Sequence, residues 1–234
     1  MRSKWDVFFK AIQQENFQDL IFTGLKNTIL IAILGLLIGI LIGMVIAIIK
    51  VAPKYKWYMK VLHKLGTVYV AIFRGTPMVV QLLVAYYVLL PLFGVKGVAP
   101  LNIAILVFGL NSAAYVSEIM RGGINSVDRG QLEAGRALGL SYPTTMIKII
   151  IPQAIKNILP TLGNEFITLI KETSVVSFVT VVDLYTAFNT IGTNTYSVVI
   201  PYLVMAIIYL GLVLLITLLI KILERSLGKS DRRN

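Results

Sequence analysis

The chain contains several long apolar segments, and these constrain its fold more than any other feature of the sequence. Between Thr28 and Ile49 there is no charged residue. A segment buried in a bilayer must satisfy its own backbone hydrogen bonds, which a helix does, and about 20 helical residues cross the ~30 Å hydrocarbon core. We therefore predict an all-α integral membrane protein with five transmembrane helices, at about residues 28–49, 68–93, 101–120, 158–182 and 198–223.

The composition excludes a water-soluble globular domain. Hydrophobic residues make up 57% of the chain, charged residues make up 14%, and the mean hydropathy is +0.82. Five helices and short loops use nearly all of the 234 residues, so we predict a single transmembrane domain over residues 1–234. The chain has no cysteine and therefore no disulfide and no thiolate metal ligand.

Residues 1–20 are predicted to form an amphipathic helix in the membrane interface. From Trp5 to Leu20, aromatic and aliphatic side chains recur among polar ones at roughly helical spacing. This stretch lacks a short apolar core followed by a small-residue cleavage site, so we expect no removable signal peptide.

Three glycines, Gly35, Gly39 and Gly43, recur at four-residue intervals in the first predicted span. A ridge of small residues lets the backbone of another helix approach closely. The ridge predicts helix packing and no chemistry.

Basic residues are distributed unevenly between the predicted loops. Five lysines lie within residues 50–64 without an acidic residue, and such loops stay in the cytoplasm. With this loop inside, fifteen Lys and Arg residues fall on the inner side and five on the outer side, which predicts an outside N-terminus and a cytoplasmic C-terminus. Topology thus accounts for the net charge of +11, and we expect a multi-pass protein of the cell membrane with lipid contacts and no nucleic-acid partner.

Residues 129–152 form the longest polar stretch between two apolar segments. We predict one short helix over 129–138, ended by Gly139 in a left-handed conformation. A second helix is predicted over 142–151, with Ser141 as its N-cap and Pro143 at its first helical position. This segment faces the cytoplasm in the predicted topology, and its shape suits docking into a groove of another protein.

Polar side chains follow one face of three predicted spans. Charged groups in hydrocarbon cost several kcal/mol unless they face other helices or a wet cavity, so these faces indicate the interior of the bundle. The motif Gly75-Thr76-Pro77 adds a helix break in the second span. We predict that the polar faces meet around one substrate pathway, whose residues are Arg74, Gln81, Asn111, Tyr115, Glu118, Asn164, Glu165, Thr168, Lys171 and Glu172.

The same charges also allow a purely structural interpretation. In this interpretation Arg74 and Glu118, which fall at similar depth, form an ion pair that locks the bundle, and Lys171 pairs with a neighbouring acid. Glu172 and Lys171 lie near the middle of the bilayer in the predicted topology, and two interpretations stay open for them: a structural role, or a role in substrate passage or gating.

No catalytic or metal-binding motif accompanies these features. The sequence Gly228-Lys229-Ser230 ends like a phosphate-binding loop, but Leu223 stands where its first glycine belongs. His63 lies alone in a lysine-rich loop, without partners for a metal ion or a nucleophile. We therefore predict a non-enzymatic subunit that takes its energy from a separate protein.

Residues 133–152 resemble the EAA loop of binding-protein-dependent ABC importer permeases. In that pattern, Glu-Ala-Ala is followed after three residues by Gly and after nine more by Ile-x-Leu-Pro. Here Gly135 replaces the second alanine and Ile151 replaces leucine, with the spacing unchanged; the matching positions are Glu133, Ala134, Gly135, Gly139, Ile149 and Pro152. Segments 73–77, 113–124, 164–166 and 171–174 are similar to signatures of permeases for histidine, glutamine and arginine.

The resemblance implies a type I ABC importer fold, like that of methionine permeases, in which the EAA residues form cytoplasmic coupling helices. It implies ABC ATPase subunits that carry ATP and Mg, with no cofactor in this chain. It also implies an extracytoplasmic amino acid-binding protein and a second permease copy, identical or closely related. The three acids against two bases within the predicted pathway favour a cationic amino acid, namely arginine, lysine or histidine, with glutamine next.

Two other classes of function stand beside this one. An ion-coupled amino acid carrier would work without an ATPase and use Glu172 as its coupling residue. A membrane scaffold would have interactions only, and the polar faces of the spans argue against it.

Overall fold

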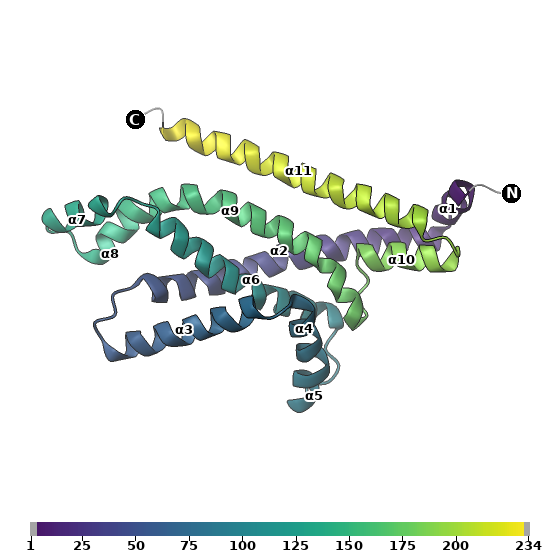
Figure 1. The fold of residues 1–234 in the computed structure, drawn as a ribbon, viewed down its shortest axis with the longest axis horizontal. Coiled ribbons are helices and arrows are strands. Elements are labelled where there is room, and N and C mark those ends of the chain that lie inside the picture. The colour runs from purple at the N-terminus through teal and green to yellow at the C-terminus, as the bar shows by residue number, and fades with distance from the viewer. Residues whose placement is uncertain (1–3, 232–234) are drawn as a thin grey trace. The chain divides into compact units, whose positions relative to one another are not determined.

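All secondary structure in the described part of the chain is helical. The computed structural model describes the backbone of residues 4–231 and the side chains of residues 4–225. Its elements in chain order (Figure 1) are α1 (Lys4–Ile12), α2 (Glu15–Val51), α3 (Trp57–Gly75), α4 (Met78–Leu83), the π-helical η1 (Val84–Leu89), α5 (Leu90–Leu92), α6 (Pro100–Asn125), α7 (Arg129–Ala137), α8 (Tyr142–Thr145), the π-helical η2 (Met146–Ile150), α9 (Ile151–Glu172), the 3₁₀-helical η3 (Thr173–Val179), α10 (Leu184–Asn194) and α11 (Val199–Asp231).

These elements form two compact units. The first comprises the chain up to Leu37 together with Thr76–Gly109 and Phe166–Leu215, and the second comprises Ile38–Gly75, Leu110–Glu165 and the chain from Ile216 onward. The long helices α2, α6, α9 and α11 each contribute residues to both units.

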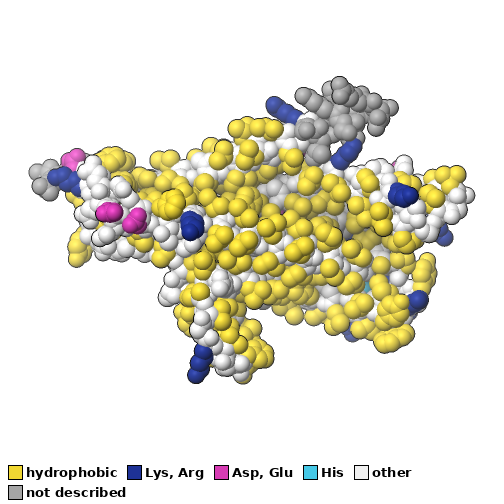
Figure 2. Space-filling view, turned by 180° about the vertical axis from the view of Figure 1, so that it is seen from behind, with side chains coloured by type: hydrophobic (Ala, Val, Ile, Leu, Met, Phe, Trp, Pro, Cys, Tyr) yellow, Lys and Arg dark blue, Asp and Glu magenta, His cyan; other side chains and the backbone are white. Residues whose placement is uncertain are grey.

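Three helices of the described chain are long and apolar enough to cross a membrane: α2, α6 and the Val199–Arg225 part of α11. A fourth candidate exists if α3 and Met78–Leu92 count as one broken span. The predicted number of five is therefore not confirmed, since α9 carries Asn164, Glu165, Lys171 and Glu172 and does not qualify by composition. Hydrophobic side chains cover most of the face shown in Figure 2.

The N-terminal prediction is wrong in its boundaries. The helix predicted to reach Leu20 ends at Ile12, and α2 begins at Glu15 and continues without a break into the first predicted span. Part of the apolar face of α1 is covered by protein: Phe8 and Ala11 are buried in a cluster with Leu184 and Phe188 of α10. Trp5 and Phe9 of α1 are exposed, so α1 packs on α10 with only some of its apolar side chains.

The second and fourth predicted spans are both interrupted. Pro77 has an extended backbone (φ −63°, ψ 142°) and separates α3 from α4, which confirms the break expected at residues 75–77. The helix predicted to reach residue 182 leaves α-geometry after Glu172, and its 3₁₀ continuation ends at Thr180, which has a left-handed φ of 62°. Asp183 then caps α10 through its carboxylate.

The glycine ridge of α2 packs against α6, as predicted. A Cβ atom on Gly39 would lie 2.7 Å from Ser112 Oγ, and one on Gly43 would lie 2.9 Å from the carbonyl oxygen of Ala113. On Gly35 it would lie 3.1 Å from Phe108 Cβ. The two backbones therefore approach at a distance that only glycine permits.

We expect the variant Gly39→Ala to lower the melting temperature of the detergent-solubilised protein, because the added methyl group overlaps Ser112. The matched control is Gly211→Ala in α11, where nothing lies within 4 Å of the added carbon. In that variant only the higher helix propensity of alanine acts, and it stabilises α11 by up to ~1 kcal/mol. Equal melting temperatures for the two variants would contradict the close α2–α6 contact.

Candidate functional site

Segment 129–152 begins with a capped helix that ends at a left-handed glycine. Asp128 Oδ1 accepts a hydrogen bond of 2.6 Å from the backbone N–H of Gly130 at the start of α7. At its end, Gly139 has φ +76°, its N–H donates to the carbonyl of Arg136, and the N–H of Leu140 donates to the carbonyl of Gly135. This pair of bonds is a Schellman motif, and it confirms Gly139 as the predicted terminator.

The second part of the segment differs from the prediction in two respects. Ser141 is the N-cap, with its Oγ accepting from the N–H of Thr144, but Tyr142 is then the first helical residue and Pro143 the second. The helix also does not stop at residue 151. It continues through η2, which contains Ile149, into α9, where Pro152 is the second residue. Pro152 has no N–H to donate within this continuous helical backbone, and the π-helical turn η2 lies directly before it, where the regular α-helical hydrogen-bond pattern is already interrupted.

Gly135 explains how α7 and α8 pack together. A Cβ atom at this position would lie 2.6 Å from Thr145 Cγ2 and 2.7 Å from Thr145 Oγ1, and Thr145 is fully buried. The replacement of alanine by glycine, which weakens α7 as an isolated helix, therefore lets the two short helices come into contact.

The outer surface of this segment is partly apolar. Leu138 is 80% exposed and Ile147 is 65% exposed, and Glu133 and Ala134 of α7 are exposed as well. Exposed leucine and isoleucine side chains on an otherwise polar segment can contact another protein. Neither exposure was predicted from the sequence.

A cavity of about 340 Å³ lies beside α7 in the second unit. Its lining includes Glu133 and Arg136 of α7, Tyr142 of α8 and Val51 at the end of α2. The hydroxyl of Tyr142 donates to the carbonyl of Val51 at 3.4 Å. Residues 129–152 therefore contact the end of α2.

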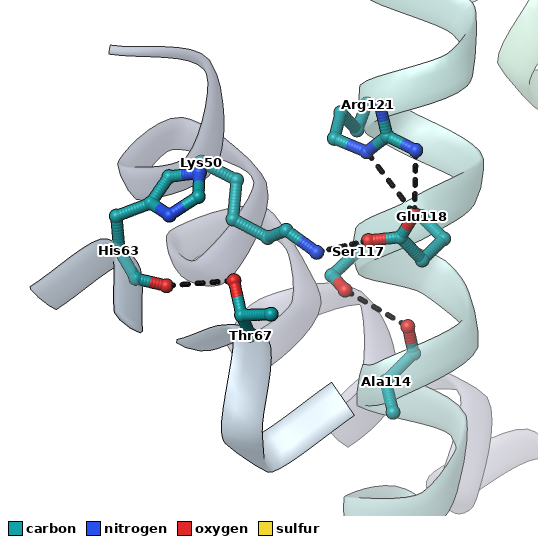
Figure 3. A network of polar contacts seen from close by, with 7 residues as sticks. All are labelled: Lys50, His63, Thr67, Ala114, Ser117, Glu118 and Arg121. Atoms are coloured by element: carbon teal, nitrogen blue, oxygen red, sulfur yellow. Dashed lines mark hydrogen bonds and ion pairs between the residues drawn. The ribbon is translucent and has the colours of Figure 1, made fainter. Parts of the chain in front are cut away.

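Glu118 forms ion pairs with Lys50 and Arg121, and not with Arg74. Lys50 Nζ forms an ion pair with Oε1 of Glu118, and Arg121 donates to Oε2 from Nη2 at 2.7 Å and from Nε at 3.1 Å (Figure 3). The predicted ion pair between Arg74 and Glu118 is wrong. The guanidinium of Arg74 instead lies 5.3 Å from the ring centre of Tyr115, a cation–π contact.

Two other predicted pathway residues are buried among helices of the second unit. Glu165 is 9% exposed and accepts a hydrogen bond of 2.9 Å from Ser112 Oγ, the same hydroxyl that Gly39 approaches. Asn111 is 4% exposed and donates to the carbonyl of Phe73. The structure thus brings Arg74, Asn111 and Tyr115 together where α3 meets α6, with Asn111 held by the backbone of α3.

The predicted pathway residues of α9 differ in their exposure. Asn164, Thr168 and Lys171 are exposed, whereas Glu165 is buried and Glu172 is half-buried. Helical spacing of three and four residues places the three exposed side chains on one side of α9. In the first unit, Gln81 donates to the carbonyl and hydroxyl oxygens of Thr76, across the break before α4.

No group of three or more His, Asp and Glu side chains in the described residues could hold a metal ion.

The chain belongs to the family of binding-protein-dependent transport system inner membrane components, whose model matches residues 39–229. It is 42% identical over 163 residues to an arginine transport system permease protein of Bacillus subtilis, covering 70% of this chain and 74% of that protein. It is 45% identical over 159 residues to a putative glutamine transport system permease protein of Rickettsia bellii, and the match covers 68% of this chain and 72% of that protein. An L-cystine transport system permease protein of Bacillus subtilis is 34% identical over 226 residues, and the match covers 96% of this chain and 92% of that protein.

Solved structures support the fold. The crystal structure of an amino acid ABC transporter with histidines contains a chain with 37% identity and a TM-score of 0.84, covering 97% of this chain and all of that one. An inward-facing methionine ABC transporter has a chain with a TM-score of 0.77 at 19% identity, covering 92% of this chain and 99% of that one. The predicted methionine-permease-like fold is confirmed.

We expect Gly135→Ala to loosen segment 129–152, although it restores the alanine of the EAA pattern, because the methyl group overlaps Thr145. The measurement is the rate of tryptic cleavage after Arg129 and Arg136, which rises when the segment opens. Adding Thr145→Ala removes the overlapping atoms and should return cleavage to the rate of Thr145→Ala alone. Unchanged cleavage in Gly135→Ala would contradict the contact between α7 and α8.

Proposed function

We propose that this chain is the membrane subunit of an ATP-driven importer that moves a polar amino acid into the cytoplasm, with residues 129–152 as its coupling segment. The observation that carries the proposal is the construction of that segment. Two short helices are held by a Schellman motif and by the Gly135–Thr145 contact, and the segment exposes Glu133, Leu138 and Ile147. Such a surface suits a groove on an ATPase subunit.

The coupling segment is joined to α9 without a loop. Helical backbone runs from Tyr142 through η2 and α9 to Glu172. A force applied to the segment by an ATPase would therefore act directly on the helix that carries Asn164, Thr168 and Lys171. We propose that Asn164, Arg74 and Tyr115, which all belong to the second unit, contribute to the substrate pathway, and that Asn111 and Glu165 of the same unit position the helices around it. Thr168 and Lys171 lie in the part of α9 that belongs to the first unit, and we propose them separately as pathway residues.

The charge balance alone does not select the amino acid. Pairing with Lys50 and Arg121 occupies Glu118, which leaves Glu165 and Glu172 against Arg74 and Lys171. An even balance fits glutamine as well as it fits arginine, lysine or histidine. Arginine is the first substrate to test, because an arginine permease is among the relatives with high identity over most of the chain.

The proposed assembly has two permease subunits, either two copies of this chain or this chain and a close relative. Two ATPase subunits would bind ATP and Mg on the cytoplasmic side, and a binding protein would deliver the amino acid from outside. The chain itself would then have no catalytic role, with its N-terminus outside and its C-terminus in the cytoplasm, as the loop charges predict.

Reconstitution of the permease in proteoliposomes with a cognate ATPase and binding protein tests this function. We expect uptake of radiolabelled arginine only when all components and ATP are present, with glutamine, lysine and histidine as competitors. Accumulation by the permease alone under a proton or sodium gradient would contradict the proposal and identify an ion-coupled carrier.

For Glu172, we expect Glu172→Gln to reduce ATP-dependent uptake at least tenfold while the amount of assembled complex stays unchanged. The reason is that a half-buried carboxylate among transmembrane helices is functional by default. The matched control is Glu224→Gln, at an exposed position near the end of α11. Uptake equal to that of the control would assign Glu172 a structural role.

A further inference from the structure

A second cavity of the second unit is lined mainly by basic and polar side chains. Its volume is about 440 Å³, and it lies between the end of α2, the first half of α3 and the end of α6. The lining residues are Lys50, Val51, Lys54, His63, Thr67, Arg121 and Asn125. Three of these seven side chains carry a permanent positive charge and none is acidic, so the cavity, here called the basic pocket, is suited to an anion.

The side chains of the basic pocket are held in place by their own contacts. Lys50, whose side chain is 9% exposed, and Arg121, at 40%, are both bound to the carboxylate of Glu118. The hydroxyl of Thr67 donates to the backbone carbonyl of His63 at 2.9 Å, and Figure 3 shows these residues around Lys50. Positioning of the donors before a ligand arrives lowers the entropic cost of binding.

The charge of the cluster is not balanced within it. Glu118 supplies one negative charge against the positive charges of Lys50, Lys54 and Arg121, which leaves an excess of two. Like charges this close together repel one another, and a bound anion would relieve that repulsion. A phosphate group has the charge and the acceptor oxygens that Lys and Arg bind.

The surroundings of the pocket favour a lipid headgroup as the source of such a phosphate group. Two helices that could span a membrane, α2 and α6, end at the pocket. Tyr55, in the connection from α2 to α3, is 89% exposed, and Trp57, the first residue of α3, is 76% exposed. Lys56 Nζ lies 5.7 Å from the ring centre of Tyr58. Exposed Trp and Tyr rings are enriched at the level of lipid headgroups, and clustered lysines there attract anionic lipids.

We propose that the basic pocket binds the headgroup phosphate of an anionic phospholipid. This proposal does not depend on the transported substrate or on an ATPase. Val51 and Asn125 also line the cavity beside α7, so the occupied pocket would adjoin the coupling segment.

Native mass spectrometry of the purified chain tests the proposal, with phosphatidylglycerol, phosphatidylcholine and inorganic phosphate as separate probes. We expect saturable binding of phosphatidylglycerol well above that of phosphatidylcholine. The variant Lys54→Gln should weaken phosphatidylglycerol binding about fivefold, as expected for one basic residue near a headgroup. Lys54 is exposed and lies outside the Glu118 ion pairs, so this variant should fold normally.

The matched control is Lys96→Gln, in the connection between α5 and α6, which should bind as the wild type does. Equal binding of the two lipids, or equal losses in the two variants, would show that no specific headgroup site exists. Inorganic phosphate that binds as tightly as phosphatidylglycerol and displaces it would assign the pocket to a free anion and overturn the lipid proposal.

Discussion

The close contact between α2 and α6 is the constraint on which much of the structure depends. Gly39 leaves room for Ser112, and the hydroxyl of Ser112 in turn donates to Glu165 of α9. Near the end of both helices, Lys50 of α2 binds Glu118 of α6. A side chain at Gly39 would push Ser112 away and leave the buried carboxylate of Glu165 without this donor, so one small residue maintains the contact of three helices.

The coupling segment shows a similar dependence on a small residue. Gly135 lets α7 contact Thr145, and the left-handed Gly139 reverses the chain between the two short helices. Because helical backbone continues from α8 into α9, the segment cannot tilt far without moving α9. This continuous helical connection, combined with the exposed Leu138 and Ile147, is what we expect of a segment that transmits force between two proteins.

Local sequence rules predicted the helix caps, terminators and breaks, whereas the contact partners of side chains could be identified only from the fold. The Schellman glycine, the Ser141 cap and the break before Pro77 follow from the conformational limits of single residues. The glycine ridge follows from a regular spacing. The partner of Glu118 follows from no local pattern, because Lys50 is 68 residues away in the sequence and entered the prediction only as a loop charge that sets the topology. The burial of Phe8 and Ala11 against α10 likewise could be found only from the fold, because no local pattern indicates it.

The polar faces were also predicted only in part. Glu165 and Thr168 of α9 were both predicted to line the pathway, yet Glu165 is buried against Ser112 of α6 and Thr168 is exposed. Glu165 and Asn111 therefore belong to helix packing, which depends on where α6 lies.

Site-specific cross-linking to an ATPase subunit tests the central claim most directly. The chain has no cysteine, so a single Leu138→Cys or Lys96→Cys change supplies the only thiol. In membranes that contain the cognate ATPase, a short bifunctional reagent should link position 138 to the ATPase, with a yield that changes when ATP is added. Position 96 should give no such product. The absence of a product at 138, or equal products at both positions, would contradict the assignment of residues 129–152 as the coupling segment.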